Sequence, residues 1–196
     1  MVRRAAALAA IILTTLALTG CFVVTKNVPA GQPVLDGRLI GTWRGLDDEG
    51  AKETEAFLSF QKYDDHKPLR LVWVEGKGYQ LYDVITMRIA NRNVFVATLT
   101  GPEEALKEKD MAAGHFIGFY ELAGDSLRFW PLDSEKIGKL IQAGKLKGSR
   151  GPGKWEMATL TGTPQELAAF LASPDALAAQ IDEPAKLRRL TPPVNE

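Results

Sequence analysis

The sequence contains little of what most catalytic and metal-binding sites require. It has one cysteine, Cys21, so the chain cannot form an internal disulfide bond. Its two histidines, His66 and His115, exclude a histidine-rich metal site unless carboxylates supply most of the ligands. The acidic clusters at 47–49 and 64–65 lack the ligand spacing of a calcium loop, and turn formation explains both. We therefore expect no metal and no cofactor.

The chain also lacks a serine in the Gly-x-Ser-x-Gly pattern of a nucleophile elbow. A pair of catalytic carboxylates would be assembled by the fold and leaves no pattern in the sequence. Lysine and arginine together number 24, and so do aspartate and glutamate. This balance gives no reason to propose nucleic acid as a partner. Since no catalytic motif is present, we expect a protein that is not an enzyme.

Long hydrophobic runs are scarce as well, and the run at the amino terminus is short. Arg3 and Arg4 precede an uncharged, apolar segment from Ala5 to Leu18. These fourteen residues, at about 1.5 Å per residue, cannot cross a hydrocarbon core of roughly 30 Å as a helix. A charged start, a short apolar segment and small residues before a cleavage site are typical of a secretory signal peptide. We predict that residues 1–20 are removed on export.

The apolar segment ends in Leu18-Thr19-Gly20-Cys21, which resembles the lipobox of bacterial lipoproteins. The resemblance implies that Cys21 is acylated on sulfur, that the signal is cut just before it, and that the new amino group is acylated too. Two acyl chains suffice to hold a protein on a bilayer without a transmembrane helix. Acylation also accounts for a lone cysteine in an exported protein. The alternatives are an ordinary signal peptide with a chance cysteine and an uncleaved anchor.

The residue after the cysteine bears on the choice of membrane. Phe22 stands where the retention signal of enteric bacteria has an aspartate. By this resemblance, we expect a lipoprotein of the outer membrane that faces the periplasm, provided that the organism has two membranes. The alternative address is the outer face of the cytoplasmic membrane.

The segment behind the cysteine is rich in proline and glycine and has no periodicity. We interpret residues 21–33 as the lipidated cysteine and a flexible tether that adds nothing to a core. Residues 1–30 should therefore be dispensable for folding. Residues 34–196 are expected to form a single β-rich domain, which at this size needs no disulfide.

The first landmark of this domain is Gly41-Thr42-Trp43. It resembles the Gly-x-Trp signature at the first strand of lipocalins and related calycin barrels. The resemblance implies that Trp43 closes the floor of a barrel. The alternative is a tryptophan that packs at the start of a strand in any β core.

Alternating apolar and polar residues predict antiparallel strands over most of the domain, and clusters of turn residues separate them. Capping residues predict short helices after Asp133, Thr163 and Ser173, and a further charged helix is expected between 101 and 110. Beyond the strand at Trp43, the expected strands cover residues 56–63, 69–75, 79–90, 94–100, 114–122, 126–131, 155–161 and 186–190.

This pattern predicts a mainly β fold with a few short helices. We expect an antiparallel, lipocalin-like barrel of about eight strands, since closure removes exposed strand edges. The alternative is an open antiparallel sheet with helices on one face.

One glycine-rich segment, 148–154, matches six of the spacings of a phosphate-binding P-loop. Trp155 stands where a serine or threonine hydroxyl must meet the magnesium ion, and a strand rather than a helix is expected to follow. We therefore expect no nucleotide. The basic residues here could contact anionic headgroups, acidic glycans or a partner protein, and the alternative is a solvated, mobile loop. These cations are Lys145, Lys147, Arg150 and Lys154.

Two functions fit a non-catalytic, lipid-anchored envelope protein. In the first, the domain binds a lipid or another small apolar molecule in a cavity lined by inward-facing aromatic side chains. The candidates are Trp43, Trp73, Phe95, Phe119 and Trp130. In the second, the barrel is filled and the protein contacts, inhibits or helps to assemble another envelope protein through loops such as 144–154. An alternating strand reads the same around a cavity and around a packed core, so the pattern does not choose.

Overall fold

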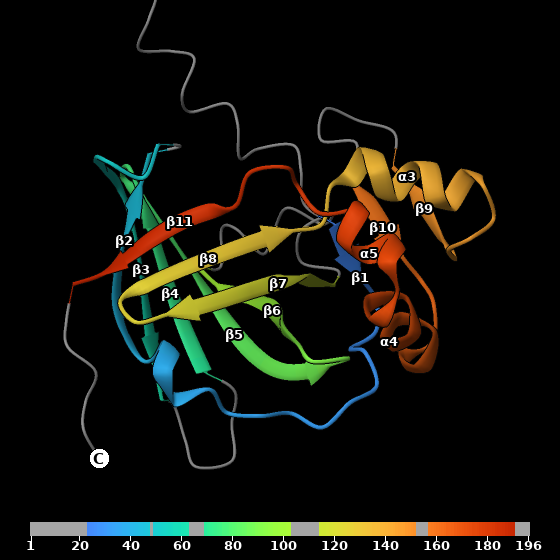
Figure 1. Ribbon diagram of the computed structural model, residues 1–196, viewed down its shortest axis with the longest axis horizontal. Coiled ribbons are helices and arrows are strands. Elements are labelled where there is room, and N and C mark those ends of the chain that lie inside the picture. Colours follow the sequence, from blue (N-terminus) through green and yellow to red (C-terminus); the bar gives the residue numbers. More distant parts are fainter. Residues whose placement is uncertain (1–22, 48, 63–68, 103–113, 152–156, 191–196) are drawn as a thin grey trace, which may run out of the picture.

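Eight antiparallel strands close into a barrel in the computed structural model of the protein (Figure 1). The structure describes residues 23–47, 49–62, 69–102, 114–151 and 157–190. From β2 to β8, each strand of the barrel pairs with its neighbour along the chain. The barrel strands are β2 (Gly41–Leu46), β3 (Glu53–Gln61), β4 (Leu69–Glu75), β5 (Gly78–Ile89), β6 (Arg92–Gly101), β7 (His115–Ala123), β8 (Ser126–Pro131) and β11 (Ala185–Arg189).

The barrel is closed by β11, which lies between β8 and β2. Leu187 of β11 is opposite Leu127 of β8 on one side and opposite Gly45 of β2 on the other. Each of the eight strands therefore has a hydrogen-bonded neighbour on both sides. The predicted mainly β, lipocalin-like barrel of about eight antiparallel strands is confirmed, and the alternative of an open sheet is wrong.

Between β8 and β11 the chain leaves the barrel and forms a small helical insertion. Local capping explains where its helices begin. The Asp133 carboxylate accepts hydrogen bonds from the backbone N–H groups of Glu135 and Lys136, while Thr163 and Glu166 form a capping box. The insertion consists of α3 (Ser134–Gln142), β9 (Gly148–Arg150), β10 (Ala158–Leu160), α4 (Pro164–Ala172) and α5 (Pro174–Ala178).

The segment that the sequence presents as a tether belongs to the folded domain. Val23, Val24 and Thr25 form strand β1 (Val23–Thr25), and none of the three is more than 2% exposed. This strand pairs in parallel with β10 and antiparallel with β7. The prediction of a flexible tether is therefore wrong from Val23 onward, and so is a domain boundary at residue 34. The reason is local: three β-branched residues precede the first proline, and they favour a strand.

Residues 26–36 then run along the outside of the barrel to the short 3-10 helix η1 (Gly37–Leu39), as Figure 1 shows. They are tied to β5 on the way. The backbone N–H of Val34 donates to the Thr86 carbonyl at 2.8 Å, and the Thr86 hydroxyl donates to the Val34 carbonyl. This part of the predicted tether is thus hydrogen-bonded to the barrel.

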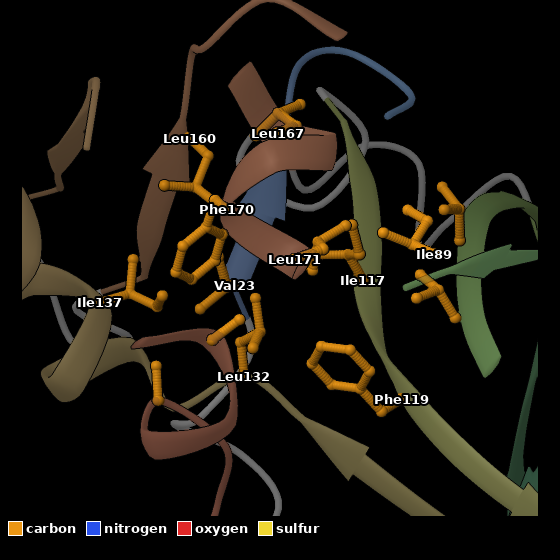
Figure 2. Close-up of a cluster of buried hydrophobic side chains, with 14 of the residues drawn as sticks. Val23, Ile89, Ile117, Phe119, Leu132, Ile137, Leu160, Leu167, Phe170 and Leu171 are labelled. Carbon is orange, nitrogen blue, oxygen red and sulfur yellow. The ribbon is translucent and has the colours of Figure 1, made fainter. Parts of the chain in front are cut away.

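The described residues pack into two hydrophobic clusters, one inside the barrel and one outside it. Along β7 the side chains alternate, with Phe116 and Tyr120 in the inner cluster and Ile117 and Phe119 in the outer one. Side chains from β1, β7, α3 and α4 converge in the outer cluster (Figure 2). The helices therefore cover the outer face of the barrel at β5 to β8.

None of the helices in the described ranges is both long enough and apolar enough to cross a membrane. The lipobox segment, Cys21, residues 103–110 of the expected charged helix and Lys154 lie outside the described residues. Gly101, at the start of that expected helix, belongs to β6.

Candidate functional sites

The five aromatic residues predicted to line a cavity do not lie together. Trp43, Trp73 and Phe95 belong to the cluster inside the barrel. Phe119 and Trp130 belong to the cluster outside it, where they are cross-strand partners on β7 and β8. The prediction of an inward position is therefore wrong for these two. Their strands carry apolar side chains on both faces, because the helical insertion buries the outer face as well.

The inside of the barrel is occupied by the protein's own aromatic rings. The centroid of the Phe129 ring lies 5.1 Å from that of Phe95, 6.3 Å from that of Phe60 and 6.4 Å from that of Tyr120. Separations of this size are those of directly packed aromatic pairs. Phe129 is thus the centre of a packed aromatic core that the sequence did not reveal.

At one end of the barrel, Trp43 is fully buried beneath η1. Its indole Nε1 donates to the Leu39 carbonyl at 2.8 Å. The guanidinium group of Arg189 lies over one face of the ring and donates to the carbonyls of Ile40 and Arg38. Trp43 is therefore enclosed by the protein's own packing, and no part of its ring is open to a ligand.

A polar cluster joins η1 to the inside of the barrel. The Tyr120 hydroxyl donates to Asp36 Oδ2 at 3.0 Å, and the Arg38 guanidinium donates to both carboxylate oxygens of Asp36. Burial works to raise the pKa of Asp36, but hydrogen bonds from Arg38 and Tyr120 and the charge of Arg38 hold it below its ordinary value. Burial and the Asp36 carboxylate raise the pKa of Tyr120. At neutral pH, Asp36 is therefore ionised and Tyr120 protonated. The cluster is thus a set of fixed hydrogen bonds that joins the segment at η1 to β7, rather than an acid–base pair.

Trp73 carries a buried donor that lacks a partner in the described part of the chain. Its indole Nε1 is inaccessible to solvent, and no acceptor among the described residues lies within hydrogen-bond distance. Trp73 is opposite Leu58 of β3, which is in turn opposite Trp43, so both indoles belong to one cross-strand row. This Nε1 is a polar atom of the inner cluster that could donate a hydrogen bond to a small molecule.

The predicted surface cations do not form one patch. Lys145 Nζ lies 3.2 Å from Asp175 Oδ2, and Lys147 Nζ lies 2.7 Å from Glu166 Oε1. Both lysines line a surface pocket of about 410 Å³ between α3, β10 and α4. Its apolar wall is made by Leu140, Leu146, Leu160, Leu167 and Phe170. Arg150 is not among the residues that line this pocket; it lies at the end of β9 and against Gly138 of α3.

Within the described ranges, no group of three histidine, cysteine, aspartate or glutamate side chains could hold a metal ion. His115 lies beside the Thr98 hydroxyl, with 2.7 Å between Nδ1 and Oγ1. Burial lowers the pKa of its ring, which is therefore neutral at neutral pH. Comparisons of the chain with protein-family models, curated proteins and solved structures found no match.

Proposed function

We propose that the protein is a bacterial lipoprotein, held on the envelope by an acylated Cys21 in the outer membrane and facing the periplasm. The support is the apolar segment that ends in Leu18-Thr19-Gly20-Cys21. On the membrane, the domain is a non-catalytic contact protein that binds another envelope protein through its outer surface.

The packed rings around Phe129 are the observation that favours contact with a protein over binding of a small molecule inside the barrel. Phe60, Phe95 and Tyr120 pack around Phe129 in the cluster inside the barrel. Protein interiors are close-packed, whereas a site for a small molecule needs several hundred Å³ of space. Because aromatic side chains occupy that space, the outer surface is where this protein has room for a partner.

The anchor is tested by replacing the cysteine. Cys21→Ser should abolish labelling by a radioactive fatty acid and release the exported domain into the soluble fraction. The matched control is Ser149→Ala, which removes an exposed hydroxyl and leaves the anchor intact. A Cys21→Ser protein that remains in the membrane pellet contradicts the anchor.

The contact function is tested by photo-crosslinking in intact cells. A photoreactive amino acid is placed at exposed positions on different sides of the domain, at Lys145, Glu55 and Lys77. Contact with a partner predicts a discrete protein adduct from one side, formed only on irradiation and absent from the other positions. If no position yields an adduct, contact with a protein is contradicted.

The buried Nε1 of Trp73 favours a second candidate function, the binding of a small apolar molecule with one hydrogen-bond acceptor. Native mass spectrometry of the purified domain separates the two. A mass equal to the polypeptide and its acyl chains supports contact through the surface. A further mass that is lost in Trp73→Phe, which keeps an aromatic ring but removes the donor, supports the ligand.

A further inference from the structure

The position of β1 fixes how close the folded domain can be to a lipid on Cys21. Val23 is buried and paired at the first described residue of the chain. Only Phe22 lies between Val23 and Cys21, so the two Cα–Cα steps that join them span at most about 7 Å. This is less than the width of an α-helix with its side chains. The domain therefore has no tether on which to stand away from the bilayer.

The cross-strand register shows which surface surrounds the start of β1. Val23 is opposite Ala158 of β10, and Ala158 is opposite Arg150 of β9. Adjacent strands are about 4.8 Å apart, so Arg150 is roughly 10 Å from Val23 across the sheet. The backbone N–H of Ala158 also donates to the Ser134 hydroxyl, which brings the first turn of α3 to the same place.

The other side of the barrel lies away from this point. In the ring of eight strands, β3 is four strands from β7 in either direction. Since β1 pairs with β7, β3 is on the opposite wall of the barrel from β1, and Figure 1 shows the two strands on opposite sides. The outer face of β3 is thus the part of the barrel that is farthest from the anchor.

We propose that the bilayer surface is the partner of the helical insertion, and that β9 and the first turn of α3 lie against the lipid headgroups while β3 faces the periplasm. This inference rests on the proposed acylation of Cys21. It assigns the insertion to the membrane and leaves the outer wall at β2 to β4 open to a protein partner.

The charges on this surface indicate that the acyl chains, not electrostatic attraction, hold it in place. On α3, Lys139 pairs with Glu135 at 2.8 Å and Lys136 pairs with Asp182 at 2.6 Å. Each of these two lysines on α3 is therefore matched by a carboxylate. The contact of this surface with the bilayer should depend little on anionic lipid or on salt.

The test uses the full, acylated protein in phosphatidylcholine vesicles that contain a lipid with a nitroxide on its headgroup. A fluorophore is attached through a cysteine introduced at Ser149 on β9 or, as the matched control, at Glu55 on β3; both residues are exposed. Acylation of Cys21 leaves each introduced thiol as the only reactive one. The nitroxide should quench the fluorophore at Ser149→Cys several-fold more strongly than at Glu55→Cys.

A second variant tests whether the short connection causes the difference. About twelve glycine and serine residues inserted between Phe22 and Val23 form a flexible linker with an r.m.s. length of roughly 20 Å. This insertion should bring the quenching at the two positions close together. Equal quenching without the linker, in protein whose mass confirms acylation, overturns the orientation alone. A protein without acyl chains overturns the anchor as well, so the two failures are distinguishable.

Discussion

The guanidinium carbon of Arg189 lies 4.0 Å from the centroid of the Trp43 ring. Only 4% of the Arg189 side chain is exposed, and its nitrogens donate to two backbone carbonyls of the segment that forms η1. The Arg189 side chain therefore joins β11, which closes the barrel, to β2 and to η1.

This arrangement predicts a large loss of stability when the tryptophan is removed. Trp43→Ala should lower the free energy of unfolding by about 3–5 kcal/mol, because a fully buried ring is lost and a cavity remains. Arg189→Lys keeps the charge but cannot reach both carbonyls in one plane, so a smaller loss is expected. Urea unfolding measures both, with Arg188→Lys as the exposed control. A Trp43→Ala protein as stable as its parent would refute the packing role.

Removing β1 should destabilise the domain. A soluble variant that starts at Val23 is compared with one that starts at Lys26. The shorter chain exposes the surface that Val23 and Val24 cover, and each buried valine contributes about 1.5–3 kcal/mol. Thermal unfolding should begin at a lower temperature in the shorter chain. Val34→Ser is the control, since that side chain is 51% exposed. Equal stability of the two chains would show that β1 is dispensable.

Gly118 on β7 should tolerate no larger residue. A Cβ atom there would lie 2.6 Å from the Trp130 carbonyl oxygen and 2.8 Å from Cε1 of Phe95. Gly118→Ala should therefore cost about 1–3 kcal/mol through overpacking. At Gly37 no atom lies within 4 Å of such a Cβ, so Gly37→Ala serves as the matched control. Chemical denaturation distinguishes the two, and similar losses in both would contradict the close approach of β7 to Phe95.

Acid should weaken the hydrogen bonds of Asp36 that join η1 to the barrel. The pKa of Asp36 is lower in the folded protein than its ordinary value of 3.8. Its contribution to stability is therefore complete above the unfolded pKa and is lost as the pH falls through the folded pKa. As the pH falls from about 6 to about 2, the free energy of unfolding should therefore decrease less in Asp36→Asn than in the parent. Urea melts across this range check the prediction, with Glu75→Gln as the exposed control. If the free energy of unfolding depends on pH in the same way in the parent and in Asp36→Asn, the stabilising role of Asp36 is excluded.

Arg92 should hold the helical insertion on the barrel. Its Nη1 donates to the carbonyls of Leu171 and Ser173, both at 2.9 Å, where α4 ends and α5 begins. Arg92→Ala leaves these carbonyls without that donor. Hydrogen exchange should become faster in α4 and stay unchanged in β3, whereas Arg88→Ala, at an exposed position of β5, should change neither. Unchanged exchange in α4 would show that hydrophobic packing alone attaches the helical insertion to the barrel.

Local patterns predicted the parts of the fold that depend on neighbouring residues. The strands 69–75 and 126–131 have the predicted bounds, because their apolar residues alternate. The capping box of Thr163 and Glu166 is likewise a property of four adjacent residues.

What could not be predicted depends on residues far away in the sequence. Residues 116–120 are buried without interruption, so alternation in β7 does not show which face lies inside the barrel. This is why Phe119 and its partner Trp130 were assigned to the wrong cluster. Similarly, Gly148–Arg150 has the composition of a loop and becomes a strand only because β10 offers it a hydrogen-bonded neighbour.

The closing strand β11 also sets the order in which the domain can fold. Arg189 and Ile40, which it joins, are 149 residues apart. All other barrel strands are translated before β11, so a chain that is still emerging keeps the edges of β2 and β8 unpaired. Contacts this distant in sequence form slowly, and the barrel remains open until β11 has been synthesised. For the export that we propose for this protein the delay is an advantage, because the barrel stays open until β11 is available to close it.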